Sequence, residues 1–277
     1  MRLSLHFPCL LLLLLPCLTL AASCAAPPQF TQDGAQWQGW GNGYANTRHA
    51  QAGIDSTDLA SLELRWAFGF EGAGSVIGNP AVYNNTVFIG TDNGIVYALD
   101  ADTGCEYWHF QADNGVRTAP VLAGINGQWR IYFGDRNAQV YALNAGNGQQ
   151  LWKVEVDAHP AAILTGSPQF VHLEGEADPD RLIVPVSSSE EGIAAVPTYT
   201  CCSFRGSVVS LAADSGQELW KTYTIQTPAK ETGTGQTGPS GAAIWSAPTI
   251  DLAGNRIFVT TGDAYSGPAD IGTDAVM

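Results

Sequence analysis

The sequence is poor in basic residues. Lysine and arginine number 12 against 26 aspartates and glutamates, so the formal net charge is −14. Because nucleic acids and anionic membrane surfaces attract clustered positive charge, this balance argues against both as partners. A solubilising acidic surface is the simpler interpretation of the charge.

Several signatures of cofactor and membrane binding are also missing. The sequence has no C-x-x-C-H motif, so any c-type haem must belong to a partner or lie beyond these 277 residues. His109, His159 and His172 do not have the spacing of metal ligands. The apolar run from Leu10 to Leu20 contains Pro16 and is too short to span a membrane after processing.

Glycine and proline are abundant, at 31 and 15 residues, whereas charged residues make up only 14% of the chain. This composition is typical of a turn-rich all-β globular protein and differs from that of disordered or membrane-spanning chains. A chain of 277 residues can also bury a large core.

The N-terminus has the three regions of a secretory signal: Arg2, an apolar run, and small residues from Ala21 to Ala26. We predict a signal peptide over residues 1–25, with the cut after Ala25. Residues 21–24 also approximate a lipobox, which would lipidate Cys24. Either route predicts a periplasmic protein, in which disulfides persist.

An eleven-residue unit occurs three times and organises the chain. Its copies are residues 98–108, 142–152 and 210–220, each with a Gly at the seventh position and a Trp at the eleventh. The glycine supplies the positive φ of a tight hairpin. Repetition at a period of tens of residues indicates a solenoid or propeller, whose units bury their apolar faces against one another. The Trp is the expected contact between units.

Prolines open four blade-like units, near residues 80–108, 120–152, 168–220 and 248–277, and the fourth is incomplete. We therefore expect residues 26–277 to be the N-terminal part of a longer propeller. Upstream, the segment from Trp37 to Arg48 reads as a loop, and residues 62–68 as a short apolar strand.

The third unit carries an insertion from Ser187 to Arg205. Loops of more than about a dozen residues are usually functional or disordered, and this one holds paired carboxylates and adjacent cysteines. Cys201 and Cys202 have three open alternatives: a strained ring disulfide with each other, two free thiols, or one bond to Cys105.

The repeated unit resembles the tryptophan-docking motif, A-x-D-x-x-x-G-x-x-x-W, of the pyrroloquinoline quinone (PQQ) dehydrogenases. That resemblance implies an eight-bladed β-propeller, of which about half is present here. The third copy departs from the motif at Ser210 and Ala212. The segment from Trp37 to Arg48 is similar to the N-terminal segment of the same family.

The resemblance also implies a site that holds PQQ and calcium. Leu164 to Pro168 matches a motif whose Thr binds the cofactor, and residues 186–191 match one whose second Ser touches it and whose Glu ligates calcium. The cofactor-binding residues implied are Arg117, Thr165, Ser188 and Trp245, the last as the floor beneath the quinone. The calcium ligands implied are Glu191 and Asp263, with Glu190 in place of Glu191 if the register shifts by one.

A ring disulfide lies over the cofactor in quinoprotein alcohol dehydrogenases, so Cys201 and Cys202 are further cofactor-binding candidates. Their position differs from the family's, which means that a shared role depends on proximity in space. The family's catalytic base belongs to a segment after the next hairpin. Asp263 and Asp274 are the nearby acids, and we assign neither as the base.

Residues 201–206, 238–251 and 261–265 look most like the polyvinyl-alcohol dehydrogenase branch of the family. This similarity implies oxidation of secondary hydroxyls on a polymer or a smaller alcohol, with electrons passed to a periplasmic cytochrome c. The alternative is a propeller without cofactor, of the outer-membrane assembly lipoprotein type. Cys24 in its lipobox favours the scaffold, whereas Thr165, residues 188–191 and Trp245 favour the dehydrogenase.

Overall fold

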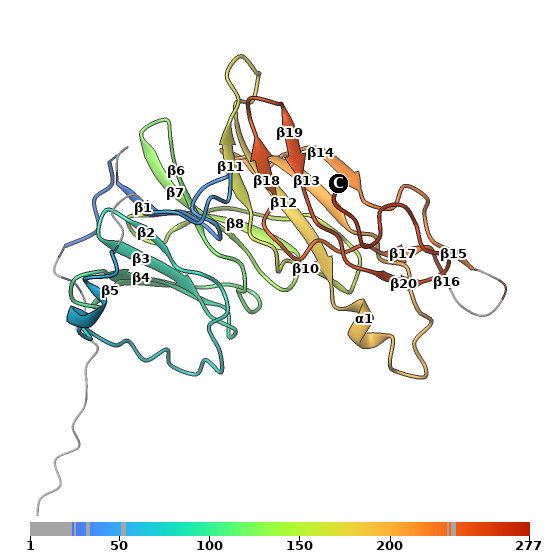
Figure 1. Ribbon diagram of the computed structural model, residues 1–277, viewed down its shortest axis with the longest axis horizontal. Coiled ribbons are helices and arrows are strands. Elements are labelled where there is room, and N and C mark those ends of the chain that lie inside the picture. The colour runs from blue at the N-terminus through green and yellow to red at the C-terminus, as the bar shows by residue number, and fades with distance from the viewer. Residues whose placement is uncertain (1–23, 25, 32–33, 51–53, 232, 234–236) are drawn as a thin grey trace, which may run out of the picture.

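The structure, a computed structural model, describes residues 24, 26–31, 34–50, 54–231, 233 and 237–277 (Figure 1). Almost all regular elements are antiparallel strands, as the composition predicts. Among the described residues, no helix is long and apolar enough to cross a membrane.

The first two units are antiparallel meanders whose strands pair in the order of the sequence. Strand β1 (Ala35–Trp37) adds to the first unit by pairing with β2. The first unit contains β2 (Ala81–Tyr83), β3 (Thr86–Gly90), β4 (Ile95–Asp100) and β5 (Glu106–Gln111). The second contains β6 (Val121–Ile125), β7 (Gln128–Gly134), β8 (Gln139–Asn144) and β9 (Gln150–Glu155).

The third unit repeats this meander and carries the insertion after its second strand. Its strands are β11 (Gln169–His172), β12 (Asp180–Ser188), β13 (Ser207–Ala212) and β14 (Glu218–Tyr223). The short strand β10 (Ala162–Ile163) pairs with the end of β12. Helix α1 (Glu190–Ile193) opens the insertion.

The fourth unit contributes β18 (Thr249–Asp251) and β19 (Arg256–Phe258), and a bridge joins Thr260 to Val276. Beside it lie two small pairs, β15 (Lys230–Glu231) with β16 (Thr237–Gly238), and β17 (Ser240–Gly241) with β20 (Ala264–Ser266). The remaining element is a 3₁₀ turn, η1 (Leu59–Ser61).

The repeated glycine and tryptophan contact each other between neighbouring units. Gly148 has a φ of 72°, and a Cβ added to it would lie 2.7 Å from the ring of Trp108. The indole Nε1 of Trp108 donates to the carbonyl oxygen of Ala145 at 2.9 Å. Trp152 contacts Gly216 in the same way. The predicted contact between units is therefore confirmed.

The segment predicted as a strand over residues 62–68 is not one, because no strand pairs with it. Leu64 in this segment is 86% exposed. Trp66 nevertheless packs on Gly104 of the first unit, and its Nε1 donates to Ala101 O at 2.8 Å. Trp66 thus contacts a hairpin glycine as the repeat tryptophans do, although it lies outside any strand.

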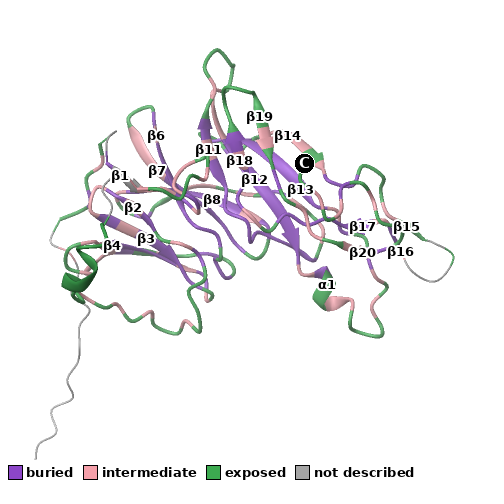
Figure 2. Ribbon diagram, viewed as in Figure 1, coloured by how far each residue is buried: buried purple, intermediate pink, exposed green. Residues whose placement is uncertain are grey.

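The apolar core lies between successive units, where Figure 2 shows the buried parts of the strands. One cluster joins the first two units and includes Phe88 and Tyr141, and another joins the second and third and includes Tyr132 and Val184. All four side chains are fully buried. Each unit is therefore stabilised mainly by its neighbours, as expected for stacked repeats.

The N-terminal loop links the beginnings of several units. The side chain of Asn79 donates to Trp40 O at 2.9 Å, and Gln169 donates to the side-chain oxygen of Asn46 at 3.1 Å. Asn46 in turn donates to Pro248 O at 2.9 Å. One loop therefore holds the starts of the first, third and fourth units together.

Candidate functional site

The meander brings the predicted site residues to one edge of the units. In an antiparallel meander the second and fourth strands run in the same direction, so the loops that follow them lie at the same edge. Each candidate residue falls in one of these two kinds of loop or at its boundary. After fourth strands come Arg117, Thr165 and Trp245; after second strands come Ser188, Glu190, Glu191, Cys201, Cys202 and Asp263.

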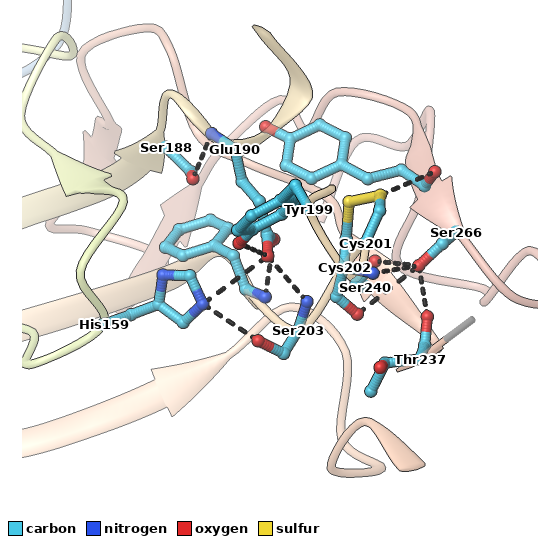
Figure 3. Close-up of a disulfide and its surroundings, with 12 residues drawn as sticks. His159, Ser188, Glu190, Tyr199, Cys201, Cys202, Ser203, Thr237, Ser240 and Ser266 are labelled. Atoms are coloured by element: carbon cyan, nitrogen blue, oxygen red, sulfur yellow. Dashed lines mark hydrogen bonds and ion pairs between the residues drawn. A yellow bond between two sulfur atoms is a disulfide. The ribbon is translucent and has the colours of Figure 1, made fainter. Parts of the chain in front are cut away.

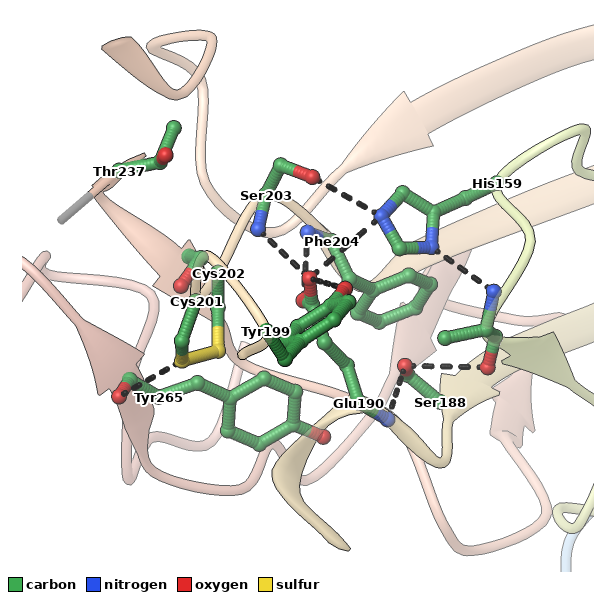
Figure 4. A network of polar contacts seen from close by, with 12 residues as sticks. His159, Ser188, Glu190, Tyr199, Cys201, Cys202, Ser203, Phe204, Thr237 and Tyr265 are labelled. Carbon is green, nitrogen blue, oxygen red and sulfur yellow. Dashed lines mark hydrogen bonds and ion pairs between the residues drawn. A yellow bond between two sulfur atoms is a disulfide. The ribbon is translucent and has the colours of Figure 1, made fainter. Parts of the chain in front are cut away.

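Glu190 is fully buried at the start of the insertion and holds the loop that carries the two cysteines (Figure 4). Its carboxylate accepts hydrogen bonds from Ser203 N at 2.9 Å, Phe204 N at 2.8 Å and the Tyr199 hydroxyl at 2.7 Å. His159 Nε2 lies 3.7 Å from the same carboxylate. Both carboxylate oxygens are therefore engaged by the protein itself, which leaves Glu191 as the better placed metal-ligand candidate.

Tyr199 belongs to this network through the hydrogen bond that its hydroxyl donates to Glu190. Burial and then its hydrogen bond to Glu190 raise the pKa of Tyr199 to about 12. The phenol thus stays protonated at neutral pH and remains a donor. Sequence reasoning did not single out this tyrosine, because its partner is nine residues away across an irregular loop.

Cys201 and Cys202 are bonded to each other in the structure (Figure 3). Their loop is attached to the fourth unit, since Cys202 N donates to the Ser266 hydroxyl at 3.0 Å and Thr237 N donates to Cys201 O at 2.9 Å. The ring disulfide therefore sits where the insertion of the third unit meets β16 and β20, the short strands beside the fourth unit.

We expect the same bond in the mature protein. Trypsin releases residues 182–205 as one peptide that contains both cysteines. Without reduction, mass spectrometry should find this peptide two hydrogens lighter than the dithiol form. A cross-linked peptide that joins it to Cys105 would contradict the assignment.

Tyr265 lies beside the ring disulfide, and sequence reasoning gave it no role. Its ring is stacked on Phe204 with centroids 6.5 Å apart, and its buried hydroxyl has no hydrogen-bond partner among the residues that the structure describes. Burial, with the negative charges of Glu191, Asp263 and Glu190, raises the pKa of Tyr265 above its usual value. This hydroxyl is therefore a protonated donor. An unpaired buried donor is costly without a ligand or water to accept from it.

The hydroxyls of Thr165 and of the two serines at the end of β12 lie close together and are buried. Thr165 Oγ1 lies 2.6 Å from Ser187 Oγ. Ser188 instead donates to Ala161 O at 3.1 Å and accepts from Glu190 N at 2.9 Å. Ser188 is thus committed to local backbone, and Ser187 is the serine that shares hydrogen bonding with Thr165.

Trp245 has an open face, because 41% of its surface is exposed. A Cβ added to Gly262 would lie 3.1 Å from its indole nitrogen, so this glycine leaves room beside the ring. Asp263 follows directly and is exposed, as is Glu191. Within the described part of the chain, no three His, Cys, Asp or Glu side chains gather into a metal site.

Arg117 is not brought into the cluster around Glu190 and the ring disulfide. It is exposed and lines a cavity of about 180 Å³ at the junction of the first two units. Arg136 and Asp92 line the same cavity. Two guanidinium groups at one opening can attract an anion.

Comparisons with known proteins agree with the propeller-type repeats inferred from the sequence. The family described as outer membrane protein assembly factor BamB (PQQ_2) matches residues 50–265. Two polyvinyl alcohol dehydrogenases, from Pseudomonas sp and Sphingopyxis sp. (strain 113P3), are 39% identical over 261 residues and 37% identical over 269 residues. These matches cover 91% and 93% of this chain but only 39% and 40% of the relatives.

The crystal structure of quinohemoprotein alcohol dehydrogenase from Comamonas testosteroni superposes with a TM-score of 0.64 at 18% identity, over 85% of this chain and 36% of that one. This likeness confirms the predicted class, an all-β chain of propeller-type units. The tryptophan docking, the meanders and the family match together show that the chain belongs to the PQQ_2 β-propeller family, and its sequence is similar to polyvinyl alcohol dehydrogenases.

Proposed function

We propose that the protein is a periplasmic alcohol dehydrogenase that depends on PQQ and calcium, oxidises secondary hydroxyls and passes electrons to a cytochrome c. The observation that carries the proposal is the gathering of an open aromatic face, paired hydroxyls and free carboxylates along one edge of the units. The similarity to polyvinyl alcohol dehydrogenases supports hydroxylated polymers or smaller alcohols as substrates.

The residues present fit the cofactor. The open face of Trp245 offers a flat apolar surface, and the Thr165–Ser187 pair offers hydroxyls 2.6 Å apart. The Tyr265 hydroxyl is a buried donor for which the described part of the chain offers no acceptor. PQQ, when bound, supplies the two-electron acceptor that no amino-acid side chain provides.

Glu191 and Asp263 would hold calcium, a cation that takes six to eight oxygen ligands. Both carboxylates are exposed, and both act on the pKa of Tyr265. The remaining oxygens would come from backbone, water or the cofactor itself. Arg117 would attract the acid groups of the cofactor, and we assign no residue of this chain as the base.

The alternative function is that of a scaffold propeller without cofactor, and the description of the matched family favours it. Cofactor binding separates the two functions, because the scaffold has no use for PQQ. The open Trp245 face and the unpaired Tyr265 hydroxyl favour the dehydrogenase.

The proposal is tested by fluorescence titration of the full-length protein with PQQ, with calcium and with a chelator. We expect binding only with calcium, and we expect Glu191→Ala to weaken it by at least about 10- to 100-fold, the loss seen even for outer-sphere partners of metals. Glu174→Ala, an exposed change in the β11–β12 turn at the opposite edge, is the control. Wild-type affinity in Glu191→Ala would contradict the calcium site, and no PQQ binding at all would favour the scaffold.

A further inference from the structure

Cys24 is bonded to Cys105 in the structure. The two Cα atoms lie 5.5 Å apart, a spacing typical of disulfides, although 81 positions separate the residues in sequence. Cys105 lies in the turn between β4 and β5 of the first unit. Beside the bond, the backbone N of Cys24 donates to Glu106 O at 2.9 Å. The cysteine is thus fixed to this hairpin by a covalent bond and by a hydrogen bond.

Pro28 and Phe30, which follow Cys24 in the chain, are also packed on the fold. Pro28 is buried. The ring of Phe30 lies among those of Tyr83, Phe88 and Trp129, with centroid distances of 6.1, 6.0 and 6.0 Å. Cys24, Pro28 and Phe30, which precede the N-terminal loop, therefore belong to the fold.

This arrangement conflicts with both fates that the sequence suggested for Cys24. A cut after Ala25 would remove the cysteine, and lipidation would convert its sulfur to a thioether. A single sulfur atom can take part in a thioether or in a disulfide, but not in both. The three outcomes therefore exclude one another.

We infer that the signal peptide is removed on the N-terminal side of Cys24, and that Cys24 stays in the mature protein as the disulfide partner of Cys105. In this step the two thiols lose two protons and two electrons and an S–S bond forms. A protein disulfide of the periplasm acts as the oxidant: it accepts them and is itself reduced to a dithiol. The bond fastens the mature N-terminus to the outside turn of the first unit.

The inference does not depend on the proposed function, because it concerns a modification of the chain and not the cofactor. Trypsin separates all the relevant cysteines. Cys24 falls in a peptide that ends at Arg48, Cys105 in residues 66–117, and the ring disulfide in residues 182–205. One digest of the mature full-length protein, purified without reductant, therefore distinguishes every outcome.

We expect mass spectrometry to find the Cys24 peptide joined to residues 66–117, at the sum of their masses less two hydrogens, and to find both peptides free after reduction. A free peptide that starts at Ala26 would overturn the inference, because Cys24 would then have been removed. A Cys24 peptide that carries a diacylglyceryl group would also overturn it.

The Cys105→Ser variant provides a second check, independent of the digest of the wild-type protein. We expect Cys24 in this variant to become fully reactive toward iodoacetamide under native conditions, against almost no reaction in the wild type. A Cys201→Ser/Cys202→Ser double variant is the matched control and should keep Cys24 unreactive. Equal labelling of Cys24 in the wild type and Cys105→Ser would show that no such bond exists.

Discussion

Gly148→Ala is expected to lower the free energy of unfolding by roughly 3 to 5 kcal/mol. A side chain at the observed φ of 72° costs about 1–2 kcal/mol by itself. The added Cβ would also lie 2.7 Å from the ring of Trp108, so the indole must move. Displacing the buried Trp from its contacts forfeits only part of the roughly 3–5 kcal/mol lost when such a residue is truncated, which brings the two costs together to the stated total.

Urea unfolding of the full-length protein measures this loss, and Gly127→Ala is the matched control. Gly127 has a φ of 76°, but a Cβ there would meet nothing within 4 Å. The control should therefore lose only the conformational part, about 1–2 kcal/mol. Similar losses in the two variants would mean that the tryptophan contact contributes nothing beyond backbone strain.

Glu190→Ala is expected to release the loop that carries the ring disulfide and to cost about 3 kcal/mol or more. The change leaves Ser203 N, Phe204 N and the Tyr199 hydroxyl without their acceptor. A donor left without a partner costs about 1–3 kcal/mol where it is buried, as Phe204 N is, and less where it is partly buried, as Ser203 N and the Tyr199 hydroxyl are. Glu190→Gln should be nearly as harmful, because an amide has one acceptor oxygen where the carboxylate has two.

Hydrogen exchange gives the local measurement for this prediction. The amides of Ser203 and Phe204 should lose their protection in Glu190→Ala, while the strands of the first unit keep theirs. Glu191→Gln is the control, since Glu191 is exposed and no protein group depends on it for a hydrogen bond in the described structure. Unchanged protection at Ser203 and Phe204 in Glu190→Ala would show that the carboxylate does not hold the loop.

Together these variants separate neighbouring glutamates into two roles. Glu191→Ala should weaken PQQ binding without a large loss of stability, whereas Glu190→Ala should destabilise the loop first. The family motif cannot assign these two roles, because a shift of one position along the sequence fits the same pattern with Glu190 in place of Glu191. Burial separates them: Glu190 is fully enclosed and Glu191 faces solvent.

The repeat and its local geometry could be predicted from the order of the amino acids alone. The glycine of each hairpin takes a positive φ because of a requirement within a few residues, so Gly104, Gly148 and Gly216 could be assigned without a structure. The alternating runs after each proline likewise predicted strands in all four units. These features depend on short-range conformational preferences, which can be inferred from a single sequence.

Tertiary structure alone decided which side chains meet. Trp66 docks on Gly104 without belonging to a strand, Cys24 is bonded to Cys105 across 81 positions, and the Tyr265 hydroxyl is buried without a hydrogen-bond partner among the described residues. Nothing in the neighbouring residues fixes these outcomes, because each depends on how separate units pack. Burial and long-range contact are properties of the assembled chain, so they appear only when the units are in place.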